Sequence, residues 1–201
     1  MTTEASARQA ALIARRYPSR ATLRGGREID MRLMSEADKS RFLAFARSLS
    51  TDDLLYLPWD ITDEGVVDRW LQNIAEHRTT TVLAVDSGDI VGEASLVHNE
   101  AGWTDHIGEI RVTVNSQIRG QGLGRFLAEE IFAIADSIGL ERISARMTHD
   151  QHSAQAVFES LGFQAVATLP GWVMDRSGRL RDLVVMAYDL RARGAPTSAQ
   201  R

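Results

Sequence analysis

The sequence contains no cysteine. The chain therefore has no disulfide, no thiolate ligand for zinc and no thiol that could carry an acyl group between two half-reactions. It also has no apolar run near the roughly 20 residues that span a bilayer. A basic excess, which general nucleic-acid binders normally have, is missing as well, because 23 basic residues face 27 acidic ones, for a formal net charge of −4. We expect a cytoplasmic protein that binds neither membranes nor nucleic acid and that prefers cationic partners.

What the chain does contain is enough apolar sequence for one folded domain, since 44% of its 201 residues are hydrophobic. We place this domain at residues 25–190. Residues 1–24 carry several arginines around a short apolar segment, and we expect an N-terminal arm or helix there. The tail at 191–201, RARGAPTSAQR, is expected to be disordered.

The periodicity of the apolar residues predicts an α+β domain with a mixed sheet. Strands alternate with period two, whereas helices place their apolar residues on one face. The strands are expected at 28–33, 80–85, 90–97, 107–114, 141–148, 163–169 and 183–190. Helices are expected after Ser35, after Thr62, after a glycine-rich turn at 119–125, and from Ser153 to Leu161.

The glycine-rich turn is the most informative local feature. A β-branched run, Ile110 to Val114, leads through RGQGLGR (Arg119 to Arg125) into an apolar-periodic helix. Three glycines in five residues deliver unobstructed backbone N–H groups to one point at a helix N-terminus, which is a typical anion site. The turn is not a P-loop, because no lysine and hydroxyl residue follow Gly124, and its even spacing fits the dinucleotide fingerprint poorly. A ligand-free turn is the alternative.

This turn resembles the R/Q-x-x-G-x-G/A pyrophosphate loop of the GNAT superfamily of acetyl-CoA-dependent N-acyltransferases. A second segment, DQHSAQAVFESLGF, resembles the family's N-x-x-A-x-x-x-Y-x-x-x-G-F helix, with Gln151 at the Asn position and Phe158 at the Tyr position. The resemblance covers residues 27–190 and implies a mixed, mostly antiparallel sheet flanked by helices, with acetyl-CoA as co-substrate. Segments such as GEIRVTV and DRSGRLRDLVVM further resemble bacterial protein lysine acetyltransferase domains.

The resemblance also implies which residues hold the cofactor. The strand before the turn should splay at a bulge, so that the backbone around Val112 and Val114 bonds the thioester carbonyl and the pantetheine amides. The turn should bind the diphosphate. The implied cofactor-binding residues are Val112, Val114, Arg119, Gly120, Gln121, Gly122, Gly124, Arg125, Gln151 and Phe158.

Glu109 is the candidate catalytic base. An amine with a pKa of roughly 10.4 must lose a proton before it attacks a thioester. Strand alternation places Glu109, Arg111 and Thr113 on one face of a central strand, where a carboxylate is unexpected. The lysine acetyltransferases carry a Glu at the matching position. The alternatives are a structural Glu109–Arg111 pair and Glu93 as the base.

Four further residues could each serve more than one role. Phe158 replaces the tyrosine that often protonates the leaving thiolate, which leaves a general acid in doubt. Ser153 could supply a hydroxyl or cap its helix. His149 and His152 could bind a metal, but no third ligand is in phase, so we expect ordinary loop histidines and no metal.

The predicted function is acetyl transfer from acetyl-CoA to a primary amine by direct attack in a ternary complex. Protein lysine is favoured, and a small amine or a catalytically silent acyl-CoA-binding regulatory domain is the alternative. A homodimer is possible. A run of acids without a basic residue could attract a cationic acceptor, or it could only solvate a surface. These acids are Asp52, Asp53, Asp60, Asp63, Glu64 and Asp68.

Overall fold

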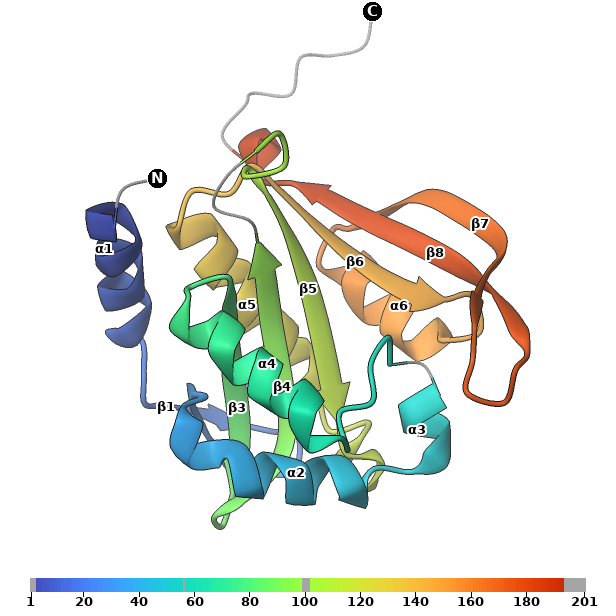
Figure 1. The fold of residues 1–201 in the computed structure, drawn as a ribbon, viewed down its shortest axis with the longest axis horizontal. Coiled ribbons are helices and arrows are strands. Elements are labelled where there is room, and N and C mark those ends of the chain that lie inside the picture. Colours follow the sequence, from blue (N-terminus) through green and yellow to red (C-terminus); the bar gives the residue numbers. More distant parts are fainter. Residues whose placement is uncertain (1–2, 56, 99–101, 194–201) are drawn as a thin grey trace, which may run out of the picture.

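A computed structural model describes residues 3–55, 57–98 and 102–193. The chain forms an eight-stranded sheet in the order β1-β2-β3-β4-β5-β6-β8-β7, with helices on both faces (Figure 1). Six of the seven neighbouring strand pairs are antiparallel, and only β5 and β6 run parallel. The expected α+β class and the mixed, mostly antiparallel sheet are confirmed. Among the described residues, no helix is long and apolar enough to cross a membrane.

The expected strands and helices are present, with boundaries that differ by a few residues. The strands are β1 (Ser19–Thr22), β2 (Glu28–Leu33), β3 (Thr79–Asp86), β4 (Asp89–His98), β5 (Ile107–Val114), β6 (Arg142–Thr148), β7 (Gln164–Met174) and β8 (Leu180–Asp189). The helices are α1 (Thr3–Ala14), α2 (Lys39–Ser48), α3 (Thr51–Leu55), α4 (Glu64–Ala75), α5 (Leu123–Ser137) and α6 (His152–Ser160). Short 3-10 turns lie at Glu36–Asp38, Ser116–Ile118 and Leu190–Arg193.

Two apolar layers hold the helices on the sheet. Helices α5 and α6 cover one face, where Leu127 and Ile131 are fully buried against the strands. Helices α2 and α4 cover the other face through residues such as Phe42 and Val67. The N-terminus of α2 follows a capping box between Ser35 and Asp38, in agreement with the helix expected after Ser35. Helices α2 and α4 pack on β4 and β3 (Figure 1), and on the neighbouring strand β5 the Arg111 guanidinium lies against the Trp59 ring.

The first 24 residues contribute to the same fold. Helix α1 packs on α5, where Gln9 Nε2 donates to the carbonyl of Ile138 at 3.1 Å. Strand β1, which the sequence did not predict, pairs with β2 at the edge of the sheet. The boundary at residue 24 stays a prediction, and residues 194–201 of the expected disordered tail lie outside the described part of the chain.

The two parallel strands diverge at the centre of the sheet. Residues 107–110 of β5 pair with residues 142–145 of β6, and beyond them the strands separate (Figure 1). The splay expected for β5 is therefore present. The expected bulge is not in β5, whose register with β4 is continuous; it lies between β3 and β4, where Val91 is the extra residue. The divergence exposes one backbone edge of residues 111–114.

Candidate active site

The glycine-rich turn forms an open N-terminus on α5. Gly122 is the N-cap residue with a φ of 96°, a left-handed conformation that favours glycine, and no side chain caps the helix. A Cβ atom added to Gly120 or Gly122 would have no heavy atom within 4 Å, so the space over the backbone is empty. The N-terminus of a 15-residue helix carries a partial positive charge and unpaired N–H groups. The turn therefore fits a diphosphate.

A groove of about 810 Å³ runs from this turn along the free end of β5 to α6. Nine of the ten predicted cofactor residues line it, namely Val112, Val114, Arg119, Gly120, Gly122, Gly124, Arg125, Gln151 and Phe158. Gln121 is not among the lining residues, and its carbonyl accepts a hydrogen bond from the Arg24 N–H at 3.0 Å. The fold thus brings the two sequence motifs to the two sides of one groove.

The two predicted arginines differ in their contacts. Arg119 Nη2 donates to the Val114 carbonyl at 3.2 Å and to Asp53 Oδ1 at 2.6 Å. Arg125 pairs with Glu129 one turn along α5, at 2.8 Å. Both side chains are more than half exposed at the mouth of the groove. Either guanidinium could reorient toward a bound diphosphate.

On the α6 side of the groove, the predicted residues mainly stabilise the fold. Gln151 is the N-cap residue of α6, and its Oε1 accepts from the Thr148 N–H at 2.9 Å. Ser153 therefore does not cap the helix, although it lines the groove. Phe158 is buried and its ring packs edge-on against Phe163, with the centroids 5.0 Å apart. A phenyl ring carries no proton for a leaving thiolate.

Glu109 lies on β5 in the open part of the sheet, just before the strands diverge. Its Oε1 accepts from Arg111 Nε at 2.9 Å, and its Oε2 accepts from Arg146 Nε at 2.8 Å. The Arg111 guanidinium also stacks on the Trp59 ring, 4.1 Å from its centroid. Both carboxylate oxygens are thus occupied by guanidinium groups. The predicted pair with Arg111 is present, and a role in catalysis would require one of these contacts to open.

Glu93 lies on the same sheet face but has a different environment. Its residue is only 1% exposed, and its Oε2 accepts from the Ser95 hydroxyl at 2.9 Å. Burial raises the pKa of Glu93 to about 7, against the opposing effects of the Thr113 and Ser95 hydroxyls and of the Arg111 charge. Thr113, directly opposite Glu93 on β5, also lines the groove. Glu93 is therefore one side chain away from the groove, with a pKa suited to proton transfer near neutral pH.

Glu93 had a partial signal in the sequence. It is the only charged residue between Ile90 and Val97, in a strand that otherwise reads as buried. The position of Thr113 beside Glu93 was not evident, because it depends on the register between β4 and β5.

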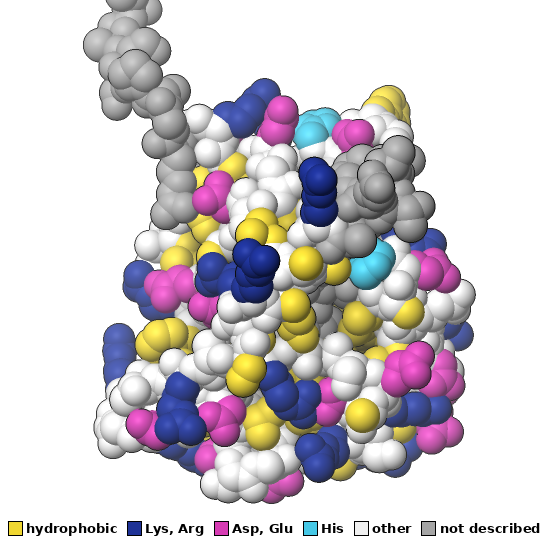
Figure 2. All heavy atoms as spheres, turned by 90° about the vertical axis from the view of Figure 1, so that its left-hand side faces the viewer, with side chains coloured by type: hydrophobic (Ala, Val, Ile, Leu, Met, Phe, Trp, Pro, Cys, Tyr) yellow, Lys and Arg dark blue, Asp and Glu magenta, His cyan; other side chains and the backbone are white. Residues whose placement is uncertain are grey.

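The acidic segment is not a free negative patch. Residues distant in sequence pair with its members: Arg119 with Asp53, Arg176 with Asp60, and Lys39 with Asp68. Asp63 is the N-cap residue of α4. On another side of the molecule, which lies at the left of Figure 1 near α1, acidic and basic side chains are also interspersed (Figure 2). Asp53 lines the groove; its side chain is 6% exposed, and its Oδ2 has no hydrogen-bond partner among the described residues.

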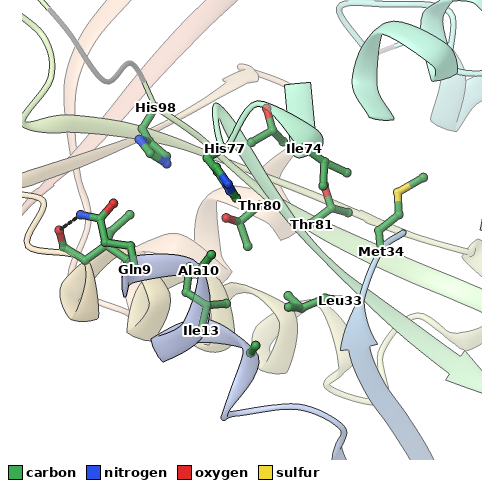
Figure 3. A pocket seen from close by; sticks show the side chains of 13 residues that line it. Gln9, Ala10, Ile13, Leu33, Met34, Ile74, His77, Thr80, Thr81 and His98 are labelled. Carbon is green, nitrogen blue, oxygen red and sulfur yellow. Dashed lines mark hydrogen bonds between the residues drawn. The ribbon is translucent and has the colours of Figure 1, made fainter. Parts of the chain in front are cut away.

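A second, smaller cavity of about 280 Å³ lies between α1 and the N-terminal end of β3 (Figure 3). Ala10, Ile13 and Leu33 form an apolar part of its wall, and His77 and His98 lie at one side. Its described lining contains no glycine-rich turn. His149 and His152 stack edge-on elsewhere, with ring centroids 5.8 Å apart, and within the described ranges no three His, Asp or Glu side chains are arranged to hold a metal.

Comparisons with known proteins agree with this geometry. The sequence model described as "Acetyltransferase (GNAT) family" matches residues 44–163, which include both the turn and α6. YwnH of Bacillus subtilis, provisionally named a phosphinothricin acetyltransferase, is 22% identical over 123 residues, which are 60% of this chain and 74% of YwnH.

Solved structures have the same fold. A ribosomal-protein-alanine N-acetyltransferase from Brucella melitensis is 26% identical, with a TM-score of 0.70 over 79% of this chain and 98% of its own. The provisionally named acetyltransferase YncA from Salmonella typhimurium, solved with its cofactor acetyl-CoA, is 21% identical, with a TM-score of 0.70 over 85% of this chain and 99% of its own. The chain belongs to the GNAT family of acetyltransferases, and acetyl-CoA is its acyl donor.

Proposed function

We propose that this acetyltransferase acetylates a primary amine by direct attack on acetyl-CoA in a ternary complex, with Glu93 as the general base. The observation that carries the proposal is the position of Glu93, buried behind Thr113, which itself lines the groove at the diverging end of β5. An acetyl-enzyme route has no cysteine to use.

The reaction uses few protein groups. The amine nitrogen attacks the thioester carbon, the C–S bond breaks, and the proton lost by nitrogen goes to the Glu93 carboxylate through Thr113 or an intervening water. Backbone N–H groups on the free edge of β5, around Val112 and Val114, would stabilise the developing oxyanion. With Phe158 at the position of the family's tyrosine, the thiolate leaves unaided, which a thiol pKa of roughly 8.5 permits.

Glu109 remains the alternative base. It lies four residues along β5 from Thr113, which is about 13 Å in an extended strand, so the two glutamates lie at different distances from the diverging end of β5. Its two guanidinium contacts suit it better to shaping the open sheet face than to accepting a proton.

The acceptor is the least defined partner. A lysine side chain in a protein is the first proposed acceptor, and a polyamine the second. The carboxylate of Asp53, which lines the groove, supports a cationic group there. The relatives' names include phosphinothricin and ribosomal-protein alanine, which favour a small amino compound or a protein N-terminus. We propose the cytoplasm as its site of action, and a homodimer stays a prediction that light scattering can test.

The test is release of free CoA thiol from acetyl-CoA in the presence of single acceptors. The panel contains a lysine peptide blocked at its N-terminus, an alanine-initiated peptide without lysine, spermidine and phosphinothricin. The proposal predicts release that depends on one of these amines, with the acetyl group found on nitrogen by mass spectrometry. Thiol release that is the same without any amine would refute it.

A further inference from the structure

A row of buried polar side chains leads away from Glu93 on the side opposite the groove. Ser95 Oγ lies 2.9 Å from Glu93 Oε2, and Thr81 Oγ1 lies 2.8 Å from Ser95 Oγ. Trp70 Nε1 of α4 donates to Thr81 Oγ1 at 2.9 Å. The register of β3 and β4 places Thr81 directly opposite Ser95, and both residues are 1% exposed. The row therefore crosses from α4 through two strands to the proposed base.

The groups at the two ends of this row determine which hydroxyl donates and which accepts in each of its hydrogen bonds. An indole N–H can only donate, and an ionised carboxylate can only accept. With a donor at Trp70 and an acceptor at Glu93, the Thr81 hydroxyl donates to Ser95, and the Ser95 hydroxyl donates to Glu93. Every proton in the row then points toward Oε2. Buried hydroxyls are costly unless all are paired, so apolar residues at positions 81 and 95 would be the simpler way to fill this core.

We propose that Trp70, Thr81 and Ser95 form a positioning relay that holds Glu93 Oε2 as a hydrogen-bond acceptor and thereby directs the substrate's proton to Oε1. This inference rests on the proposed function, because it assigns an orientation to the base named there. A proton on Oε2 would face Ser95 Oγ, and the Ser95 hydroxyl would then have to accept from Glu93 and could no longer donate to it. The relay engages Oε2, and Thr113, whose hydroxyl also bonds Glu93, lies on the groove side.

Groups on β5 act on Glu93 beside the relay, and the Thr113 hydroxyl is a further hydrogen-bond donor to it. Arg111 of β5 is the charged group that acts on Glu93. The helices that cover this face present buried apolar side chains, including Phe42 and Phe45 of α2 and Val67 of α4. The Trp70 ring itself packs edge-on against Phe42, with the centroids 5.1 Å apart, which fixes the direction of its N–H. On the far face, Leu123 and Leu127 of α5 contact Gly92.

The test measures the ionisation of Glu93 by two independent readouts in the full-length protein. One is the pH profile of kcat/KM for the best amine of the panel. The other is a titration of the Glu93 carboxyl carbon by NMR with ¹³C-labelled glutamate, assigned by its loss in Glu93→Gln. The variants are Ser95→Ala, Thr81→Val, Thr81→Ser and Trp70→Phe, and Trp103→Phe is the matched control because Trp103 is 92% exposed.

Removing a hydroxyl that donates to the ionised carboxylate should raise the midpoint of the Glu93 titration. Ser95→Ala should raise it by about one pH unit, as expected for one hydrogen bond to a charged group. Thr81→Val and Trp70→Phe should raise it by about 0.3 to 0.5 unit, whereas Thr81→Ser and Trp103→Phe should leave it unchanged. In a Ser95→Ala background, Trp70→Phe should add no further shift, because the link to Glu93 is already cut.

Wild-type midpoints in both Thr81→Val and Trp70→Phe, beside a shifted Ser95→Ala, would overturn the relay. The Thr81→Val and Thr81→Ser pair decides the question if Trp70→Phe does not fold. Failure of the proposed function is separate: a wild-type protein that acetylates no amine refutes the activity, while the NMR titration still decides the relay. Normal turnover in Glu93→Gln would refute Glu93 as the base and with it the direction of proton transfer.

Discussion

Glu93 and Glu109 lie on the same face of adjacent central strands, yet the fold gives them opposite surroundings. Glu93 is buried and accepts from neutral hydroxyls, whereas Glu109 lies at the open face and contacts two arginines. Strand alternation in the sequence predicts the sheet face of both carboxylates, but it does not distinguish their surroundings. The partners supplied by neighbouring strands decide which carboxylate can exchange a proton near neutral pH.

The largest expected effect is on turnover, and it distinguishes Glu93 from Glu109 directly. Glu93→Gln should lower kcat by about 10² to 10⁴, the usual range for loss of a general base. Glu109→Gln should lower it by less than about tenfold, because it removes a contact to Arg111 and Arg146 and not the proton acceptor. The measurement is thiol release at pH 8 with both substrates saturating. A reversal of the two effects would assign the base to Glu109.

The second prediction concerns stability, for which the sign follows from the raised pKa. Folded Glu93 holds its proton up to about pH 7, whereas the unfolded chain loses it near 4.5, so burial of this group makes the protein less stable as pH rises through that window. Glu93→Gln should therefore gain about 2 to 3 kcal/mol relative to wild type between pH 5 and pH 8. Urea unfolding at both pH values measures it, with Glu109→Gln as the control expected to show no such gain. A difference between Glu93→Gln and wild type that is the same at both pH values would contradict the burial argument.

A third prediction separates cofactor binding from proton transfer. Gly122→Val places a side chain in the open space over the turn and strains a φ of 96°, so it should weaken CoA binding tenfold or more, about 1.4 kcal/mol. Gly178→Val is the matched control, because Gly178 has a φ of 83°, equally open surroundings and no place in the groove lining. Calorimetry should show the loss only at Gly122. Equal affinity in both folded variants would remove the turn from the cofactor site.

The smallest expected effect concerns the acceptor. Asp53→Asn removes a carboxylate charge from the groove lining, and it should raise KM for a cationic amine about threefold to tenfold at low salt. Asp68→Asn, at an exposed pair with Lys39 outside the groove, should not change it. An unchanged KM in Asp53→Asn would mean that a neutral or anionic acceptor fits better.

Local patterns predicted much of this fold. The alternation of Ile110, Val112 and Val114, the three glycines of the turn and the S-x-x-D box are each contained in a few adjacent residues, and each forms the expected element. Strand β1, only four residues long with the sequence SRAT, carries no such pattern and forms because β2 offers an edge to pair with.

Tertiary pairing explains what the sequence could not reveal. The segment around Asp53 looked uniformly acidic, because its partners Arg119, Arg176 and Lys39 lie elsewhere in the chain. The hydroxyls around Glu93 likewise come from three strands. Charge and acidity at the site are properties of the assembled sheet.

The most direct test of the central claim is the pH dependence of a single turnover, with enzyme in excess over acetyl-CoA and the amine saturating. The wild-type rate should rise with one ionisation near pH 7, in addition to the ionisation of the amine itself, and Glu109→Gln should keep that step. Glu93→Gln should lose it and retain only the ionisation of the amine. A step near pH 7 that persists in Glu93→Gln, or that disappears in Glu109→Gln alone, would contradict the account.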